Sequence, residues 1–212
     1  ETEDGTVLEY HIWDVKRIKK HDDILRGKEA VVVDFEEKGF SPLPCIKMPD
    51  ISNRVDCYLT IIPGETLAKI YNQYHQHILE QNVRTFLQFK GASNKGIRDT
   101  LMGHKPTAAQ KAKGDKPRDP EPDMFFSYNN GISTTATNIE IRDTEQGPEI
   151  VKITDWQIVN GGQTTASISA SLNDRDVELG KVYVPMKISV IRDAENGENI
   201  IKAISTSANS QT

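Results

Sequence analysis

The sequence predicts a mixed domain of the α/β or α+β class, with a mixed sheet, flanking helices and an exposed loop insertion. Two observations favour this class. Short runs rich in β-branched residues, bounded by Gly, Pro or Asn, alternate with segments whose apolar residues recur every three or four positions. One long polar stretch interrupts them and holds almost no large apolar residue. With 212 residues, of which 36% are apolar, the chain can bury a sizeable core.

The first 62 residues are expected to form an N-terminal αβ segment that leads into the core. Alternating apolar residues indicate strands, and three consecutive valines suit a pleated surface better than a helix. Three prolines, at 42, 44 and 49, predict a crossing loop. The predicted elements are a strand, a helical turn and two further strands, at 6–12, 13–18, 28–35 and 54–62.

Residues 63–212 are expected to form the core domain. Apolar residues at helical spacing over 67–86 predict a long helix or a helix pair, and a short helix is expected at 97–101. Later, an Asn-Gly pair between two predicted strands indicates a hairpin. The predicted strands are 123–128, 132–141, 149–153, 155–159 and 182–191, and the helices are 166–172 and one from residue 196 or so. A polar run directly follows that last helix, so we expect a fragment truncated at its C-terminus.

The insertion at 103–122 is rich in Lys, Ala, Pro and Asp. Because it cannot bury enough apolar surface to offset the entropy of ordering, we expect it to be exposed and partly disordered. The chain carries a net charge of −5, yet residues 80–118 hold nine Lys or Arg against three acids. This basic segment is either a solvated face with a mobile loop or a nucleic-acid contact.

A glycine loop at a strand-to-helix junction is the richest candidate site. Asn160, Gly161, Gly162, Gln163 and Thr164 follow a predicted strand and precede a predicted helix. Such a junction exposes unpaired backbone N–H groups at the positive end of the helix dipole, which favours phosphate. The alternative is a tight turn capped by Thr164, with the amides bonding to local backbone.

A second polar turn contains Asn129 and Asn130 before Gly131. Taken alone it is an ordinary hairpin turn. Both turns, however, place Asn-Gly before Ser or Thr, and they can converge at one end of a sheet. Amide side chains there would recognise the donors and acceptors of a ligand without adding charge.

Three cations, Arg84, Lys95 and Arg98, are the best candidates for pairing with an anion. The planar guanidinium of arginine offers a fork of donors that fits phosphate or carboxylate. The alternative is that they form salt bridges to Glu80 or Asp99.

Several chemistries are not supported by the residues. Cys45 and Cys57 lie among apolar neighbours and indicate core thiols of a reduced protein. The Asp14-Val15-Lys16 triplet is expected at a helix start, and so does not indicate a nuclease. His75 and His77 would not share a helix face. No metal site is therefore expected, and the residues assign neither a catalytic group nor a cofactor.

Location follows from two further features of the sequence. No run of about 18 uninterrupted apolar residues could span a bilayer, and the first residues are acidic, unlike a signal peptide. We therefore expect a cytoplasmic protein with no membrane contact.

Separate blocks of the chain resemble the AIPR (abortive infection, phage resistance) family. The blocks are YNQY at 71–74 running on to LEQNVRTFL at 79–87, NKGIRDT at 94–100, FFSYNNGIS at 125–133, QIVNGGQTT at 157–165 and ANSQ at 208–211. The resemblance implies a role in bacterial defence against phage, commonly beside restriction–modification genes, in proteins longer than this chain. Any nuclease activity of such proteins is expected outside this segment.

Three functional hypotheses follow from the residues and the resemblance. The first is a domain that binds DNA, RNA, a nucleotide or another phosphate-bearing ligand, with no activity of its own. The second is a nucleotide- or DNA-processing enzyme that uses the amide-rich turns. The third is a scaffold that binds other defence proteins through the insertion at 103–122.

Overall fold

The computed structural model describes residues 30–50, 52–80, 83, 95–172, 174 and 176–210. The strand and helical turn predicted at 6–12 and 13–18 lie outside these residues, as do Arg84 and four other residues, 81, 82, 85 and 86, of the helical segment predicted at 67–86.

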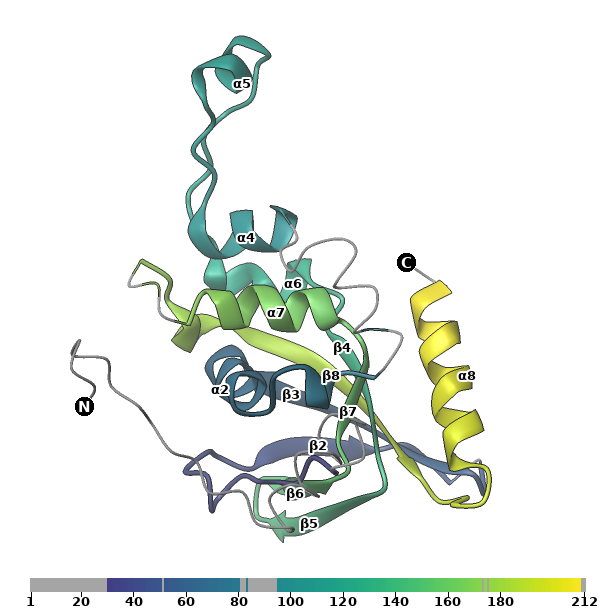
Figure 1. Cartoon of the computed structure of the whole chain (residues 1–212). Helices are drawn as coiled ribbons and strands as arrows, with labels where there is room; N and C mark the ends of the chain where they lie inside the picture. Colours follow the sequence, from purple (N-terminus) through teal and green to yellow (C-terminus); the bar gives the residue numbers. More distant parts are fainter. Residues whose placement is uncertain are drawn as a thin grey trace, which may run out of the picture. The chain divides into compact units, whose positions relative to one another are not determined.

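An eight-stranded mixed sheet organises the chain (Figure 1). Its strand order is β1-β6-β2-β3-β8-β4-β7, and β5 pairs with β6. All pairs are antiparallel except β4 with β8. The strands are β1 (Val33–Asp34), β2 (Leu43–Lys47), β3 (Val55–Pro63), β4 (Ile132–Ala136), β5 (Asn138–Thr144), β6 (Gly147–Thr154), β7 (Gln157–Asn160) and β8 (Tyr183–Ile191).

The long antiparallel pair β3 and β8 forms the middle of the sheet, as their alternating sequences predict. Tyr58 and Ile62 of β3 are buried on the inner face, whereas Leu59 and Ile61 are exposed on the outer face. The strand predictions at 54–62 and 182–191 are confirmed.

Helices lie on both faces of the sheet. On the inner face, α2 (Gly64–Tyr74) packs beside α7 (Gly162–Ala170), as Figure 1 shows. Leu67 and Ile70 of α2 and Ile168 of α7 join the core beneath them. On the outer face, α8 (Gly197–Ser210) follows β8 and packs against β7. The mixed sheet with flanking helices places the chain in the α+β class.

Of the two alternatives predicted for 67–86, the single long helix is wrong, and the helix pair is not tested because residues 81, 82 and 84–86 lie outside the described residues. Helix α2 stops at Tyr74, because His75 takes a positive φ of 49°, and the 3-10 helix η1 (His75–Ile78) follows. The short helix predicted at 97–101 is confirmed as α4 (Lys95–Met102).

The proline-rich segment at 42–49 is a strand, so its prediction as a crossing loop is wrong. Strand β2 pairs with β6 at Leu43 and Pro44, and with β3 from Cys45 to Lys47. Pro44 thus lies where β2 changes partners, a place where the missing N–H of proline disrupts neither ladder.

The strand predicted at 123–128 is also wrong. These residues form the 3-10 helix η2 (Pro122–Met124) and the helical turn α6 (Phe125–Tyr128). Pro122 presets a helical φ at the first position, and this outweighs the strand preference of the aromatic residues that follow. The Asn-Gly turn therefore joins a helix to β4, and no hairpin forms there.

Strand boundaries differ at two other places. The strand predicted at 132–141 is divided into β4 and β5 at Thr137. Among the described residues of the segment predicted at 28–35, Val33 and Asp34 form β1. Residues 31 to 212 form one compact unit, so strands on both sides of residue 62 share one sheet.

The insertion forms an arm, residues 103–121, that extends beyond α4 (Figure 1). It is exposed, as predicted, but it contains the helix α5 (Ala108–Ala112), so the described structure differs from the expected partial disorder. Thr107 and Gln110 form a complete capping box at its start. At the base of the arm, the outgoing and returning segments of the chain are joined by two backbone hydrogen bonds between His104 and Arg118, of 2.8 and 3.0 Å.

Candidate ligand-binding site

The two Asn-Gly turns meet at one end of the sheet. Strand β4 begins just after Gly131, and β7 ends just before Gly161. Because these strands pair in antiparallel fashion, with Ser133 opposite Asn160, the start of one lies beside the end of the other.

Both turns depend on glycine. Gly131 and Gly161 have φ values of +78° and +90°, where other residues are strained. A Cβ on Gly161 would lie 2.5 Å from Cγ2 of Ile132 and 2.9 Å from the carbonyl oxygen of Gly131. A Cβ on Gly131 would lie 2.1 Å from the carbonyl oxygen of Pro185. The turns therefore touch each other and the central strand β8.

Hydrogen bonds hold the Asn129 side chain between the turns. Its Oδ1 accepts from the backbone N–H of Gly131 at 2.9 Å and from the Thr164 hydroxyl at 3.5 Å. Thr164 is thus not the cap of α7. The N-cap is Gly161, which supplies no side-chain hydrogen bond, so the first backbone N–H groups of α7 have no capping side chain.

A cavity of about 1200 Å³ opens over these turns. Its described lining comes from four places: the two turns with α6 and the start of α7, residues of α4, residues of α8, and Val83. The lining residues are Val83, Gly96, Ile97, Thr100, Phe125, Tyr128, Asn129, Asn130, Gly131, Asn160, Gly161, Gly162, Gln163, Thr164, Lys202, Ser205, Thr206, Asn209 and Ser210. We call it the amide cavity.

The amide cavity combines polar and apolar lining, and none of its described lining residues is acidic. Lys202 is the charged side chain of that lining, and it lies on the exposed side of α8. One carboxylate, that of Glu80, lies close to the cavity without belonging to its described lining. Its Oε2 accepts a hydrogen bond from the Ser205 hydroxyl at 3.0 Å. The uncapped start of α7 and Lys202 together make the cavity favourable for an anion.

The amide side chains divide into two groups. Asn160 donates to the carbonyl oxygen of Ala208 at 2.8 Å and to Oδ1 of Asn209 at 3.0 Å, and Asn209 donates to the carbonyl oxygen of Val159 at 2.9 Å. These two asparagines therefore attach α8 to β7. Asn130 and Gln163 line the cavity without a side-chain hydrogen bond to any described residue.

The three predicted cations are not gathered at the cavity by the described structure. Arg84 lies outside the described residues. Lys95 and Arg98 are exposed on α4, while Gly96, Ile97 and Thr100 of the same helix line the cavity. Asp99, the suggested salt-bridge partner, pairs with Arg118 at 3.5 Å and lies 3.7 Å from His104.

The sequence did not indicate the contribution of α8 to the site. Lys202, Thr206 and Asn209 reach the cavity because the chain returns to it after β8. The only signal for this return was the ANSQ block at 208–211, which includes Asn209.

Metal ligation and thiol chemistry find no support in the part of the chain that the structure describes. It contains no group of three or more His, Cys, Asp or Glu side chains that could hold a metal ion. Cys45 is buried and Cys57 is half-buried, and neither forms a disulfide. Burial raises the pKa of the Cys45 thiol, which makes it a poorer nucleophile.

Comparison with known protein families gives a match to the second part of the chain. Residues 119–212 match the family model described as AIPR protein. This segment of the chain is similar to the AIPR family. The AIPR segment includes three of the resembling blocks, at 125–133, 157–165 and 208–211, and thus both Asn-Gly turns and α8. The blocks at 71–87 and 94–100 precede it.

The AIPR family implies a role in phage defence through abortive infection. No curated protein and no solved structure matches the chain. Among the described helices, none has the length and apolar character needed to cross a bilayer.

Proposed function

We propose that the AIPR segment acts in phage defence by binding a nucleotide, either free or at the end of a single-stranded nucleic acid, in the amide cavity. The observation that carries the proposal is the meeting of both Asn-Gly turns with the uncapped start of α7 in one cavity.

The phosphate would bind at the start of α7. Backbone N–H groups there have no capping side chain, and the helix dipole adds positive potential. Lys202, on α8, would supply a full positive charge. No described lining residue is acidic, and the nearby Glu80 carboxylate accepts a hydrogen bond from Ser205.

The base would bind among the side chains that have no described partner. Asn130 and Gln163 each offer an amide donor and an amide acceptor, which can pair with the polar edge of a base. Tyr128, whose side chain is 58% exposed, presents a ring at the cavity for stacking. The volume of the cavity is somewhat above the range typical of small-molecule sites, so it can hold a nucleotide.

The arm would extend the contact for a longer strand. Lys105, Lys111, Lys113 and Lys116 are exposed on it, and none forms a salt bridge with a described residue. The arm continues from α4, which lines the cavity. These lysines would contact phosphates beyond the bound nucleotide.

The test compares free nucleotides with a labelled single-stranded oligonucleotide, by calorimetry and by fluorescence anisotropy. Lys202→Gln and Asn130→Ala should each weaken binding of both, with about a tenfold loss for Lys202→Gln, because one charged contact is worth roughly 1.5–3 kcal/mol. Lys69→Gln, on α2, is the matched control, since Lys69 pairs with Glu65 away from the cavity.

A triple variant, Lys111→Gln, Lys113→Gln and Lys116→Gln, tests the arm separately. It should leave nucleotide affinity unchanged. For the oligonucleotide, the slope of log affinity against log salt concentration should become shallower by about two, since each of the three phosphate contacts to a single strand contributes about 0.7 to that slope. The absence of saturable binding for both probes, or equal affinities for Lys202→Gln, Asn130→Ala and Lys69→Gln, would refute the proposal.

A further inference from the structure

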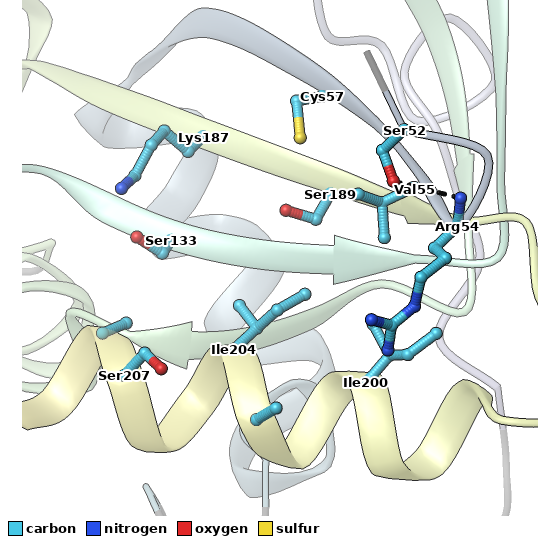
Figure 2. Close-up of a pocket in the computed structure, with 12 residues that line it drawn as sticks. Ser52, Arg54, Val55, Cys57, Ser133, Lys187, Ser189, Ile200, Ile204 and Ser207 are labelled. Atoms are coloured by element: carbon cyan, nitrogen blue, oxygen red, sulfur yellow. Dashed lines mark hydrogen bonds between the residues drawn. The ribbon is translucent and has the colours of Figure 1, made fainter. Parts of the chain in front are cut away.

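A second cavity, of about 510 Å³, lies between α8 and the outer face of the sheet (Figure 2). Its lining residues come from β3 and the loop before it, β4, β8 and α8, and none of them lines the amide cavity. Helix α8 is therefore a wall shared by two separate cavities. We call the second one the α8 groove.

The α8 groove carries two positive charges. Arg54 and Lys187 line it, and no acidic residue belongs to its described lining, although the chain has a net charge of −5. Neither cation forms a salt bridge with a described carboxylate. The nearby carboxylate of Asp56 pairs instead with Arg192 and Lys47.

The two cations lie at opposite ends of the α8 groove (Figure 2). In the register of β3 with β8, Lys187 is level with Leu59, five residues after Arg54. At about 3.3 Å per residue, their backbones are roughly 16 Å apart along the strands. A ligand with two separated anionic groups matches this spacing of the two cations better than a single phosphate or carboxylate does.

The space between the cations is amphipathic. On the sheet side, Ser189 lies midway between the cations, and Ser133 lies next to Lys187 (Figure 2). On the helix side, Ile200 and Ile204 point toward the sheet (Figure 2). A ligand here meets hydroxyl groups along one side and aliphatic side chains along the other.

The sheet beneath the α8 groove also contains a hydroxyl group with no partner. Thr135 is only 1% exposed, and its Oγ1 has no hydrogen bond in the described structure. It is opposite Ser189 in the register and two residues from Ser133, so strand alternation places it on the same face as both groove residues. Unsatisfied buried hydroxyls are uncommon, and this one lies under the groove, although Thr135 is not itself part of the described lining.

We propose that the α8 groove binds an extended organic dianion, with one anionic end at Lys187 and the other at Arg54. The aliphatic middle of the ligand would pack on Ile200 and Ile204. This site is independent of the nucleotide proposed for the amide cavity, because the two linings share no residue.

The test uses linear α,ω-dicarboxylates from adipate to hexadecanedioate, each beside the monocarboxylate of equal length, in calorimetric titrations with the full chain. Alkane bisphosphonates of the same lengths distinguish phosphate-type from carboxylate-type ends. Affinity should peak at one chain length, where the dianion should bind up to about fivefold more tightly than the monoanion, as expected for an exposed ion pair. A dianion no tighter than the monoanion at every length would refute the proposal.

Variants locate the binding. Lys187→Gln and Arg54→Gln should each remove the advantage of the dianion and leave monoanion binding nearly unchanged. Arg98→Gln, an exposed arginine outside the lining, is the matched control and should keep the advantage.

Ser189→Leu fills the middle of the groove without changing charge, and it should abolish binding of long dianions. If both charge variants behave like Arg98→Gln, the groove is not the site. Nucleotide titrations of the same variants should be unchanged, which separates this result from the fate of the amide cavity.

Discussion

The paired Asn-Gly turns and the arm are both polar, glycine-bearing segments, but they are held in opposite ways. Gly131 and Gly161 touch backbone or side chains far away in the sequence, in β8 and β4. On the arm, Gly114 has a similar positive φ of +86°, yet a Cβ there would meet nothing within 4 Å. The helix α5 beside it has no buried residue and is stabilised by its own capping box.

This difference shows which segment can change without disturbing the other. The turns take their shape from long-range packing, so that substitutions there affect the whole domain. The arm takes its shape from contacts within residues 99–118, so that its substitutions act locally. A binding cavity benefits from the first kind of construction, because its groups are held in place before a ligand arrives.

The largest expected effect is at the glycines of the turns. Gly131→Ala should lower the free energy of unfolding by roughly 2–5 kcal/mol, since it combines a strained φ with a close contact to the Pro185 carbonyl oxygen. Gly161→Ala should cost a similar amount, because its Cβ would clash with Ile132. Urea denaturation monitored by circular dichroism measures both.

Gly114→Ala is the control that separates strain from packing. Gly114 has a similar positive φ, but a Cβ there would lie in open space. The substitution should therefore destabilise the arm alone, by about 1–2 kcal/mol. Equal losses of global stability at Gly114 and Gly161 would mean that backbone strain alone explains the turns, and the comparison would fail.

The second effect concerns the attachment of α8 to the turns. Asn160→Ala removes hydrogen bonds to Ala208 and Asn209 and should lower stability by about 1–3 kcal/mol. Asn209→Ala should cost as much, and the double variant less than the sum, because both belong to one network. Asn138→Ala, at an exposed position in β5, should change stability by less than about 0.5 kcal/mol. Fully additive losses would contradict a shared network.

The contrast also explains what could be predicted from the sequence. Alternation in β3 and β8 depends on nearest neighbours in the chain, so these strands were predicted with nearly correct ends. The turns could be identified as polar and glycine-bearing, but the contact of Gly161 with Ile132 and the return of Lys202 to the cavity depend on strand order. Local patterns do not contain that order.

Two local signals were outweighed or not used. The aromatic residues after Pro122 favour a strand by composition, yet proline at the first helical position favours a turn. In the arm, Thr107 three residues before Gln110 is a capping-box pattern that predicts a helix, and composition alone predicted disorder instead. In the arm, therefore, the order of the residues predicts the helix, whereas the composition of the segment does not.

A third prediction tests how local the arm is. Thr107→Ala removes the cap of α5 and should destabilise that helix by about 1 kcal/mol. Hydrogen exchange at the N–H groups of Lys111 and Lys113, which bond within the arm, should become several-fold faster. Exchange in β3 and β8 should be unchanged, and protection lost there would show that the arm is coupled to the sheet after all.

The smallest expected effect is a loosening of the arm in acid. The His104 ring lies 3.0 Å from the Asp115 carboxylate, and the hydrogen bond that it donates holds the pKa of Asp115 below its usual 3.8, with Lys95 and Arg118 adding positive charge. Because the folded pKa is depressed, the contribution of this hydrogen bond to the stability of the arm is fully present above pH 3.8 and is lost as the pH falls through the lower folded value.

Heteronuclear NOEs of arm amides should therefore decrease on going from about pH 5 to about pH 3. Asp115→Asn should show low values at both pH values, while the amides around Gly131 and Gly161 should not change in either protein. A decrease of equal size in Asp115→Asn would assign the loosening to another group, such as Asp99 on the other side of His104.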